Sequence, residues 1–379
     1  MRDKLFPGKT QASTMRGCQR IEESLRRFEA ARDFEEPDRV PILIDVGAPF
    51  LAKVLGFTLR DYYRDAQVCK HVQVEGSRWA FSRLQDDRTA LVGPDQAKLD
   101  IGAVAEGIVF GCPISLPDEG NPWLSPWITP KPMTVEEIDE LEVPDPADCA
   151  RRLRAHYARA FGKEVEAEEA PAIHPPCSAA GSLIGTERLY IYLYKHPGAA
   201  RKLFGKLLET FCEITDYNDK LRGGRTESIG LCDDHAGYLS AEMYRKFVLP
   251  YNARIYEKYG SRWRGLHMDS RTDHLAKILL DEYAIQEMDL GAATDMAKMK
   301  EVFDGKVFFN GNVDSKILVA GEARQIEEAA ERCIRVAAPG GGYAFDCGGE
   351  TYAGIDPERL VYLVRCAKKF GKYPIRTLN

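Results

Sequence analysis

Two short stretches of this chain carry side chains that could bind a metal ion. Residues 265–270 contain His267 and Asp269, and residues 346–349 contain Cys347. Each stretch begins as a short strand pattern and then breaks into a polar turn with flanking glycine, ahead of a helix pattern. In a barrel of parallel strands, the chemistry takes place at the carboxyl ends of the strands. These residues therefore predict a metal-dependent site at that end.

The spacing of these residues is compatible with a zinc site. His267 and Asp269 are two residues apart, so in an extended chain their side chains point to the same side. Cys347 follows a strand two or three places further around, and Cys232 ends an earlier one. An imidazole, a thiolate and a carboxylate or second thiolate could hold Zn²⁺ with one open position, which is the catalytic arrangement. The alternative is that His267 is a hydrogen-bonded structural residue at a strand end.

Polar side chains at other strand ends could move protons or orient a substrate. Asp233 and Asp234 directly follow a predicted strand, and two neighbouring carboxyl groups can differ in pKa and act as proton donor and acceptor. Alternatively, one of them caps the helix that begins near Ser240 or pairs with an arginine. Asn310 and Asn312 are separated by one glycine, so Asn310 could orient a substrate oxygen, or the three residues could form a turn.

Strand and helix patterns alternate through the second half of the chain. The predicted strands cover residues 227–232, 263–267, 285–290, 307–310 and 343–346, and the helices cover residues 241–259, 272–283, 295–303, 324–337 and 357–370. Five such units in a row imply a parallel sheet. Apolar segments near Ile42 and Ile173 add two strands, and an eighth is expected within residues 93–130. The sequence thus predicts an α/β fold, a (β/α)8 barrel. A doubly wound open sheet is the alternative, but the first strand is not followed by a glycine-rich phosphate-binding motif.

The chain is expected to form one barrel with an extension and an insertion. Residues 1–35 should hold a polar arm, up to about residue 18, and a helix at residues 20–34, while residues 36–379 form the barrel. Residues 93–146 lose the helical period and are rich in proline and glycine, which predicts a cover over the barrel.

Aromatic residues in this insertion are candidate substrate contacts. Trp123 and Trp127 lie in a rigid apolar segment that could line a substrate entrance, or could simply pack as a surface hairpin. His235 and Asn312, at the strand ends, complete the set of candidate substrate contacts.

Composition excludes several functional classes. The net charge is −6 and basic residues are dispersed among acids, so nucleic acid is not an expected partner. No run of 18 apolar residues and no secretory signal is present, so no membrane segment is expected. The ten cysteines form no C-x-x-C pair, which is typical of reduced thiols and indicates the cytoplasm. A homodimer is one expected assembly, although the sequence does not determine the oligomeric state.

Five stretches of the chain resemble the uroporphyrinogen decarboxylase superfamily. They occur in the family's order, span most of the chain and comprise residues 37–42, 233–251, 266–275, 306–314 and 347–360. The resemblance implies a (β/α)8 barrel. The superfamily includes decarboxylases that hold substrate carboxylates with an arginine-containing N-terminal stretch. The corresponding residues 42–50 contain no arginine, and carboxylate groups need fixed cationic partners, which argues against the haem-pathway enzyme.

The chain is more similar to the corrinoid-dependent methyltransferase branch of this superfamily. Those enzymes act with a separate corrinoid protein and bind zinc through a His-x-Cys…Cys pattern. His267 matches the histidine and Cys347 the distal cysteine, whereas Asp269 replaces the middle cysteine. An oxygen ligand would leave zinc more Lewis acidic. Otherwise, Cys232 or an acid takes that place.

The resemblance implies a zinc-dependent methyltransferase. It would move a methyl group between a small methylated substrate, with a methyl ether or methoxyarene favoured, and the cobalt of cobalamin carried by the separate corrinoid protein. Asp233, Asp234 and Asn310 are the expected catalytic residues. Two alternatives remain open: a decarboxylase of a non-porphyrinogen or tetrapyrrole-like acid, using Asp233 and Asp234, and a catalytically inactive corrinoid-binding relative.

Overall fold

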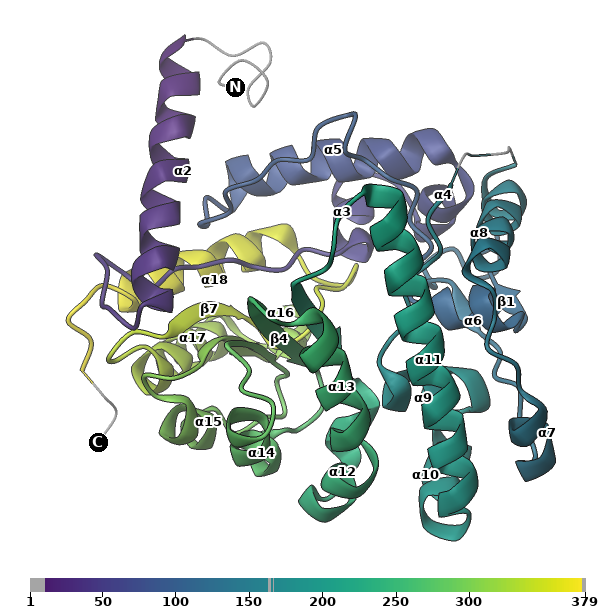
Figure 1. The fold of residues 1–379 in the computed structure, drawn as a ribbon. Coiled ribbons are helices and arrows are strands. Elements are labelled where there is room, and N and C mark those ends of the chain that lie inside the picture. The colour runs from purple at the N-terminus through teal and green to yellow at the C-terminus, as the bar shows by residue number, and fades with distance from the viewer. Residues whose placement is uncertain (1–10, 163–164, 166, 377–379) are drawn as a thin grey trace.

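The computed structural model describes residues 11–162, 165 and 167–376, with side chains from residue 17 onward (Figure 1). The N-terminal half is largely helical. Its helices are α2 (Gln11–Arg32), α3 (Ala48–Val54), α4 (Leu59–Arg64), α5 (Ala66–Arg83), α6 (Ala105–Phe110), α7 (Val135–Glu140), α8 (Pro146–Phe161), α9 (Pro176–Ile184), α10 (Thr186–Lys195) and α11 (Pro197–Arg222). In this described part of the chain, no helix combines the length and apolar character needed to cross a bilayer.

The C-terminal half alternates strands with helices around one parallel sheet. The strands are β3 (Ser228–Cys232), β4 (Trp263–Met268), β5 (Glu287–Leu290), β6 (Phe308–Val313) and β7 (Tyr343–Cys347), and they pair in sequence order. The intervening elements are η1 (Asp234–Tyr238), α12 (Ala241–Phe247), α13 (Leu249–Tyr259), η2 (Asp273–Leu275), α14 (Ala276–Asp281), α15 (Met296–Phe303), α16 (Ser315–Ala320) and α17 (Ala323–Ala337), and α18 (Pro357–Phe370) follows β7. The five predicted β–α units are therefore confirmed.

The register of the sheet sets one row of polar side chains across four strands. Cys232 lies opposite His267, His267 opposite Asp289, and Asp289 opposite Asn310. Residues paired in register on parallel strands face the same side of the sheet. The ladder therefore gathers four side chains that are up to 78 residues apart in the chain.

The segment near Ile42 joins the sheet beside β7 through a single parallel bridge to Phe345. Its position is fixed by the buried carboxylate of Asp87. One oxygen, Oδ2, accepts from the Ile42 backbone N–H at 2.8 Å and from Arg39 at 2.6 Å, and the other, Oδ1, accepts from Arg27 and Ser24 at 3.0 and 2.9 Å. This carboxylate ties α2, the bridging segment and the end of α5 together.

Two expectations about the remaining strands are wrong. Residues near Ile173 form no strand in the described chain, because Pro171, Pro175 and Pro176 lack the N–H groups that a ladder requires. Residues 93–130 contain no barrel strand. They hold the antiparallel pair β1 (Ile114–Ser115) and β2 (Trp127–Ile128).

The N-terminal helix is longer than predicted. Helix α2 begins at Gln11 rather than near residue 20 and ends at Arg32. The predicted polar arm is correspondingly shorter, and its first ten residues lie outside the described chain.

The buried imidazole of His156 in α8 gives the fold an acid-sensitive position. Burial lowers the pKa of His156 to about 4, and the positive charge of Arg159 adds to this effect. The unfolded chain would bind a proton there near pH 6.5, whereas the folded chain would not. The contribution of the neutral His156 ring to the free energy of unfolding is therefore complete above pH 6.5. As the pH falls toward 4, the free energy of unfolding decreases by up to about 3 kcal/mol.

Replacing His156 with leucine should remove this part of the acid destabilisation. Urea unfolding at pH 7 and pH 4.5 measures the effect, and the exposed His71→Gln variant on α5 provides the control. An unchanged difference between the two pH values in the leucine variant would contradict the assignment.

Candidate functional site

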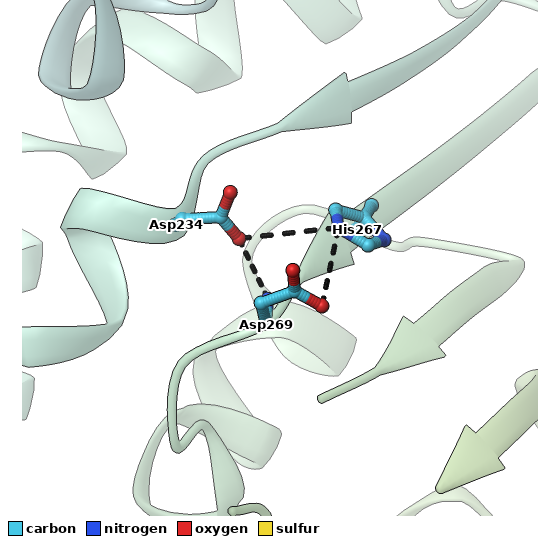
Figure 2. A group of neighbouring side chains, drawn as sticks. All are labelled: Asp234, His267 and Asp269. Atoms are coloured by element: carbon cyan, nitrogen blue, oxygen red, sulfur yellow. Dashed lines mark hydrogen bonds and ion pairs between the residues drawn. The ribbon is translucent and has the colours of Figure 1, made fainter. Parts of the chain in front are cut away.

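His267 is the centre of a group of three side chains that could hold a metal ion (Figure 2). It extends from the end of β4, and Asp269 follows it in the same loop, while Asp234 comes from η1 after β3. One ligand atom from each residue lies within 4.8 Å of the others. The His267 Nε2 atom is 3.5 Å from Asp269 Oδ1 and 4.0 Å from Asp234 Oδ1. The two carboxylates therefore face the same ring nitrogen.

The other ring nitrogen of His267 is held by a carboxylate from the next strand. Its Nδ1 lies 2.7 Å from Asp289 Oδ2, and Asn310 Nδ2 donates to Asp289 Oδ1 at 2.8 Å. Hydrogen bonds to Asp269 and Asp289 raise the pKa of His267 to about 11. The ring thus has a fixed orientation, with Nε2 directed to Asp234 and Asp269, which is how metal-binding histidines are usually supported.

Two loops are tied together beneath this group. The Asp269 backbone N–H donates to Asp234 Oδ1 at 2.6 Å, and Ser270 Oγ donates to the Asp234 carbonyl at 2.8 Å. Because the loops after β3 and β4 are joined, the spacing of the two carboxylates does not depend on flexible side chains alone.

The donor set fits a divalent metal ion. One imidazole nitrogen and two carboxylate oxygens are ligands that zinc accepts, and with three protein ligands a further position would stay open. All three side chains are partly exposed: 30% for His267, 43% for Asp234 and 49% for Asp269. Oxygen ligands also suit harder divalent ions. These three ligands therefore select the identity of the metal less strictly than a set that contains a thiolate.

Neither predicted cysteine ligand belongs to this three-residue group. Neighbouring residues of a strand face opposite sides, and in β7 it is Asp346 that lies near Asp289 and Asp45, whose charges add to the effect of burial in raising its pKa. Cys347 is 2% exposed and its thiol contacts Ser315. Cys232 lies beside His267 in the sheet and remains accessible, although partial burial raises the pKa of its thiol.

Two other predicted site residues are buried in structural positions. Asp233 is fully buried and accepts hydrogen bonds from Ser178 and Asn252, and burial raises its pKa to about 6. Asn312 is 1% exposed, and its amide donates to the Gly291 and Thr294 carbonyls. Asn312 cannot contact a substrate there. Residues 310–312 also continue strand β6 rather than forming a turn.

The remaining predicted substrate contacts lie on accessible surface. Trp123, which precedes β2, and Trp127, the first residue of β2, are each 42% exposed. The His235 ring is partly buried, its Nε2 lies 3.0 Å from Thr186 Oγ1, and burial lowers its pKa. Their role as substrate contacts stays a prediction.

A family model described as uroporphyrinogen decarboxylase (URO-D) matches residues 23–370. The chain belongs to the uroporphyrinogen decarboxylase family. Curated relatives include the uroporphyrinogen decarboxylases of Chloroherpeton thalassium, 27% identical over 62% of this chain and 70% of the relative, and of Thioalkalivibrio sulfidiphilus, 25% identical over 47% of this chain. The chain spans about half the length of the latter relative.

A solved structure supports the fold of this family member. A methyltransferase from Methanosarcina mazei is similar over 91% of this chain and 98% of its own, with a TM-score of 0.63 and 16% identity. Together with the parallel sheet, this likeness confirms the predicted α/β barrel of the TIM type. Membership of this family supports an enzyme and leaves its reaction open.

Several acidic side chains gather at the mouth of the barrel. The sequence patterns did not predict this cluster. Burial raises the pKa of Glu350 to about 7, and the charges of Asp45, Asp100 and Asp269 add to the effect. Burial likewise raises the pKa of Asp45, with a contribution from Asp289. These residues are spread from position 45 to position 350 of the chain, so no local pattern predicts their meeting.

The loops at the site approach each other so closely that Gly291 is required. A Cβ atom at this position would lie 2.0 Å from the carbonyl oxygen of Asp269, against backbone that cannot rotate away. We expect Gly291→Ala to displace Asp269, to lower metal affinity about 10–100-fold, and to cost about 1–3 kcal/mol of stability.

Calorimetric metal titration and urea unfolding measure the two effects of Gly291→Ala. The control is Gly205→Ala in α11, where a Cβ atom would meet nothing within 4 Å, so that stability should rise slightly. Unchanged metal affinity in Gly291→Ala would show that the contact does not position Asp269.

Proposed function

We propose that this chain is a metal-dependent methyltransferase. It moves a methyl group between a small methylated substrate, with a methyl ether or methoxyarene favoured, and the cobalt of a corrinoid carried by a separate protein in the cytoplasm. The observation that carries the proposal is the group formed by His267, Asp234 and Asp269, with Asp289 supporting the imidazole. Zinc is the metal we favour. When bound, it would supply Lewis acidity that makes an ether oxygen a better leaving group.

The charge of the mouth supports this proposal over porphyrinogen decarboxylation. A substrate with many carboxylates needs cationic partners, whereas the side chains that gather here, Asp45, Asp269 and Glu350, are acids. These groups would repel a polyanion and admit a neutral or cationic substrate.

A cavity of a size suited to a small molecule lies to one side of the metal group, whose residues do not line it. A cavity of about 520 Å³ lies beside the segment after Asp45, and its lining includes Val46, Arg88 and Asp100. Binding sites for small ligands are commonly of this size. Within the site, Asp289 would keep the His267 ring in one orientation, and Asn310 would keep Asp289 in place.

Metal analysis and a methyl-transfer assay test the proposal. Purified protein should contain about one metal ion per chain and, with 2-methoxyphenol and chemically reduced free cobalamin, should form methylcobalamin and catechol. A parallel incubation with uroporphyrinogen, in which carbon dioxide release is measured, tests the decarboxylase alternative. The names of the curated relatives favour that alternative. Carbon dioxide release without methyl transfer would reverse the assignment. A metal-free protein inactive in both assays would favour the inactive corrinoid-binding relative.

A further inference from the structure

A second polar pair, formed by Glu106 and His174, has no part in the metal group. Glu106, in α6, is fully buried, and its Oε1 accepts a hydrogen bond from the His174 backbone N–H at 2.7 Å. The same oxygen lies 2.8 Å from His174 Nδ1. The His174 side chain is 32% exposed, so its ring stays partly accessible while Glu106 holds its Nδ1 atom.

The hydrogen bonding of this pair leaves one nitrogen free. Within the described residues, His174 Nε2 has no hydrogen-bond partner, and neither does the buried Oε2 atom of Glu106. A carboxylate on Nδ1 fixes both the tautomer and the ring orientation of a histidine. His174 can therefore exchange a proton only through Nε2, on its exposed side.

Hydrogen bonds connect the segment that follows His174 to the turn that carries Asp234. Four residues after His174, the backbone N–H and the hydroxyl of Ser178 donate to Asp233 at 3.1 and 2.8 Å. The His235 backbone N–H in turn donates to Ser178 Oγ at 3.2 Å. The start of α9 is thus bound to the turn that carries Asp234 to the metal group.

The charged groups around His174 favour its protonated form. The hydrogen bond to Glu106 raises the pKa of His174 against the effect of burial, and the charges of Glu106, Asp233 and Asp234 add to the rise. His235, on η1, is a further titratable group near His174, and burial lowers its pKa. The protonated His174 ring is therefore stabilised by direct contact with Glu106 and by the charges of Asp233 and Asp234.

We propose that His174 is the proton donor of this site and that Glu106 positions it. This rests on the proposed methyl transfer. The bond between the methyl carbon and the substrate oxygen breaks, and the reduced corrinoid supplies the electron pair that binds the methyl group. The oxygen keeps the electron pair of the broken bond and takes the proton from His174 Nε2. His174 is left neutral, with Nδ1–H donating to Glu106, and regains a proton from water.

Leaving groups of different acidity provide the kinetic test. With 2-methoxyphenol and reduced cobalamin, we expect His174→Gln to lower the rate about 10²–10⁴-fold. With 4-nitroanisole the loss should be much smaller, because the nitrophenolate leaves without a proton. A purely structural role would give equal losses on the two substrates, and an equally active His174→Gln variant would overturn the proposal. His71→Gln, on the exposed face of α5, is the control and should keep full activity.

Nuclear magnetic resonance of labelled histidine tests the pair without catalysis. The signal absent from His174→Gln assigns the His174 ring, and its titration midpoint should fall by about 1–3 pH units in Glu106→Gln. A midpoint that does not respond to Glu106→Gln would overturn the positioning role of Glu106. Absence of methyl transfer in the unaltered protein would overturn the proposed function, and with it the step assigned to His174. An undiminished rate with 2-methoxyphenol in His174→Gln would overturn the role of His174 alone.

Discussion

Replacement of His267 with alanine is expected to abolish metal binding and methyl transfer. The variant loses the only nitrogen of the group and leaves Asp234 and Asp269 without the ring that faces both carboxylates. Replacing supporting residues of a metal site typically costs 10–100-fold in affinity, so removal of the central ligand should cost at least about 100-fold. Metal analysis after dialysis and calorimetric titration would measure the loss.

Asp289→Asn should weaken metal binding less than His267→Ala does. The variant keeps the ring but weakens the partner of its Nδ1, so affinity should fall about 10–100-fold while some binding remains. A His267→Ala variant that retains its metal ion and its activity would exclude His267 as a ligand.

Cys347→Ser tests whether Cys347 is a metal ligand. The resemblance implies that it is, whereas the structure groups His267 with Asp234 and Asp269 instead. Since the thiol is buried against Ser315, on the opposite side of β7 from Asp346, the serine variant should retain its metal ion. Loss of the metal ion in this variant would restore Cys347 as a ligand.

Replacement of Asp87 with alanine is expected to destabilise the fold by about 3–5 kcal/mol. Arg27 and Arg39, whose side chains are 12% and 13% exposed, would lose their buried carboxylate partner. The Ile42 backbone N–H would lose its acceptor as well. Since this carboxylate fixes the segment that lies beside β7, the loss should also loosen the closure of the sheet there.

Urea unfolding of Asp87→Ala, compared with Asp38→Ala, measures this effect. Asp38 binds the same Arg27 side chain, but it is 62% exposed, so its loss should cost no more than about 1 kcal/mol. Equal unfolding free energies for the two variants would contradict the role assigned to the buried carboxylate.

Local patterns were sufficient for the C-terminal half of the fold. The five strands and the final helix follow from short apolar runs and helical periodicity that end at glycine, asparagine or aspartate. The same patterns failed near Ile173, where apolar residues resemble a strand but the prolines cannot join a ladder. The helix boundary at Gln11 was missed because a polar segment carries little periodic signal.

The sequence by itself determined which residues stand at the strand ends, and with them His267, Asp269 and Asp234. Strand ends can be read from nearest neighbours, and parallel strands bring those ends to one edge. Only the tertiary structure decided that Asp289 supports His267, that Cys347 faces Ser315, and that Glu106 meets His174 across 68 residues. Register, strand pleat and packing of distant segments set these contacts, and none of them leaves a mark in the local order of residues.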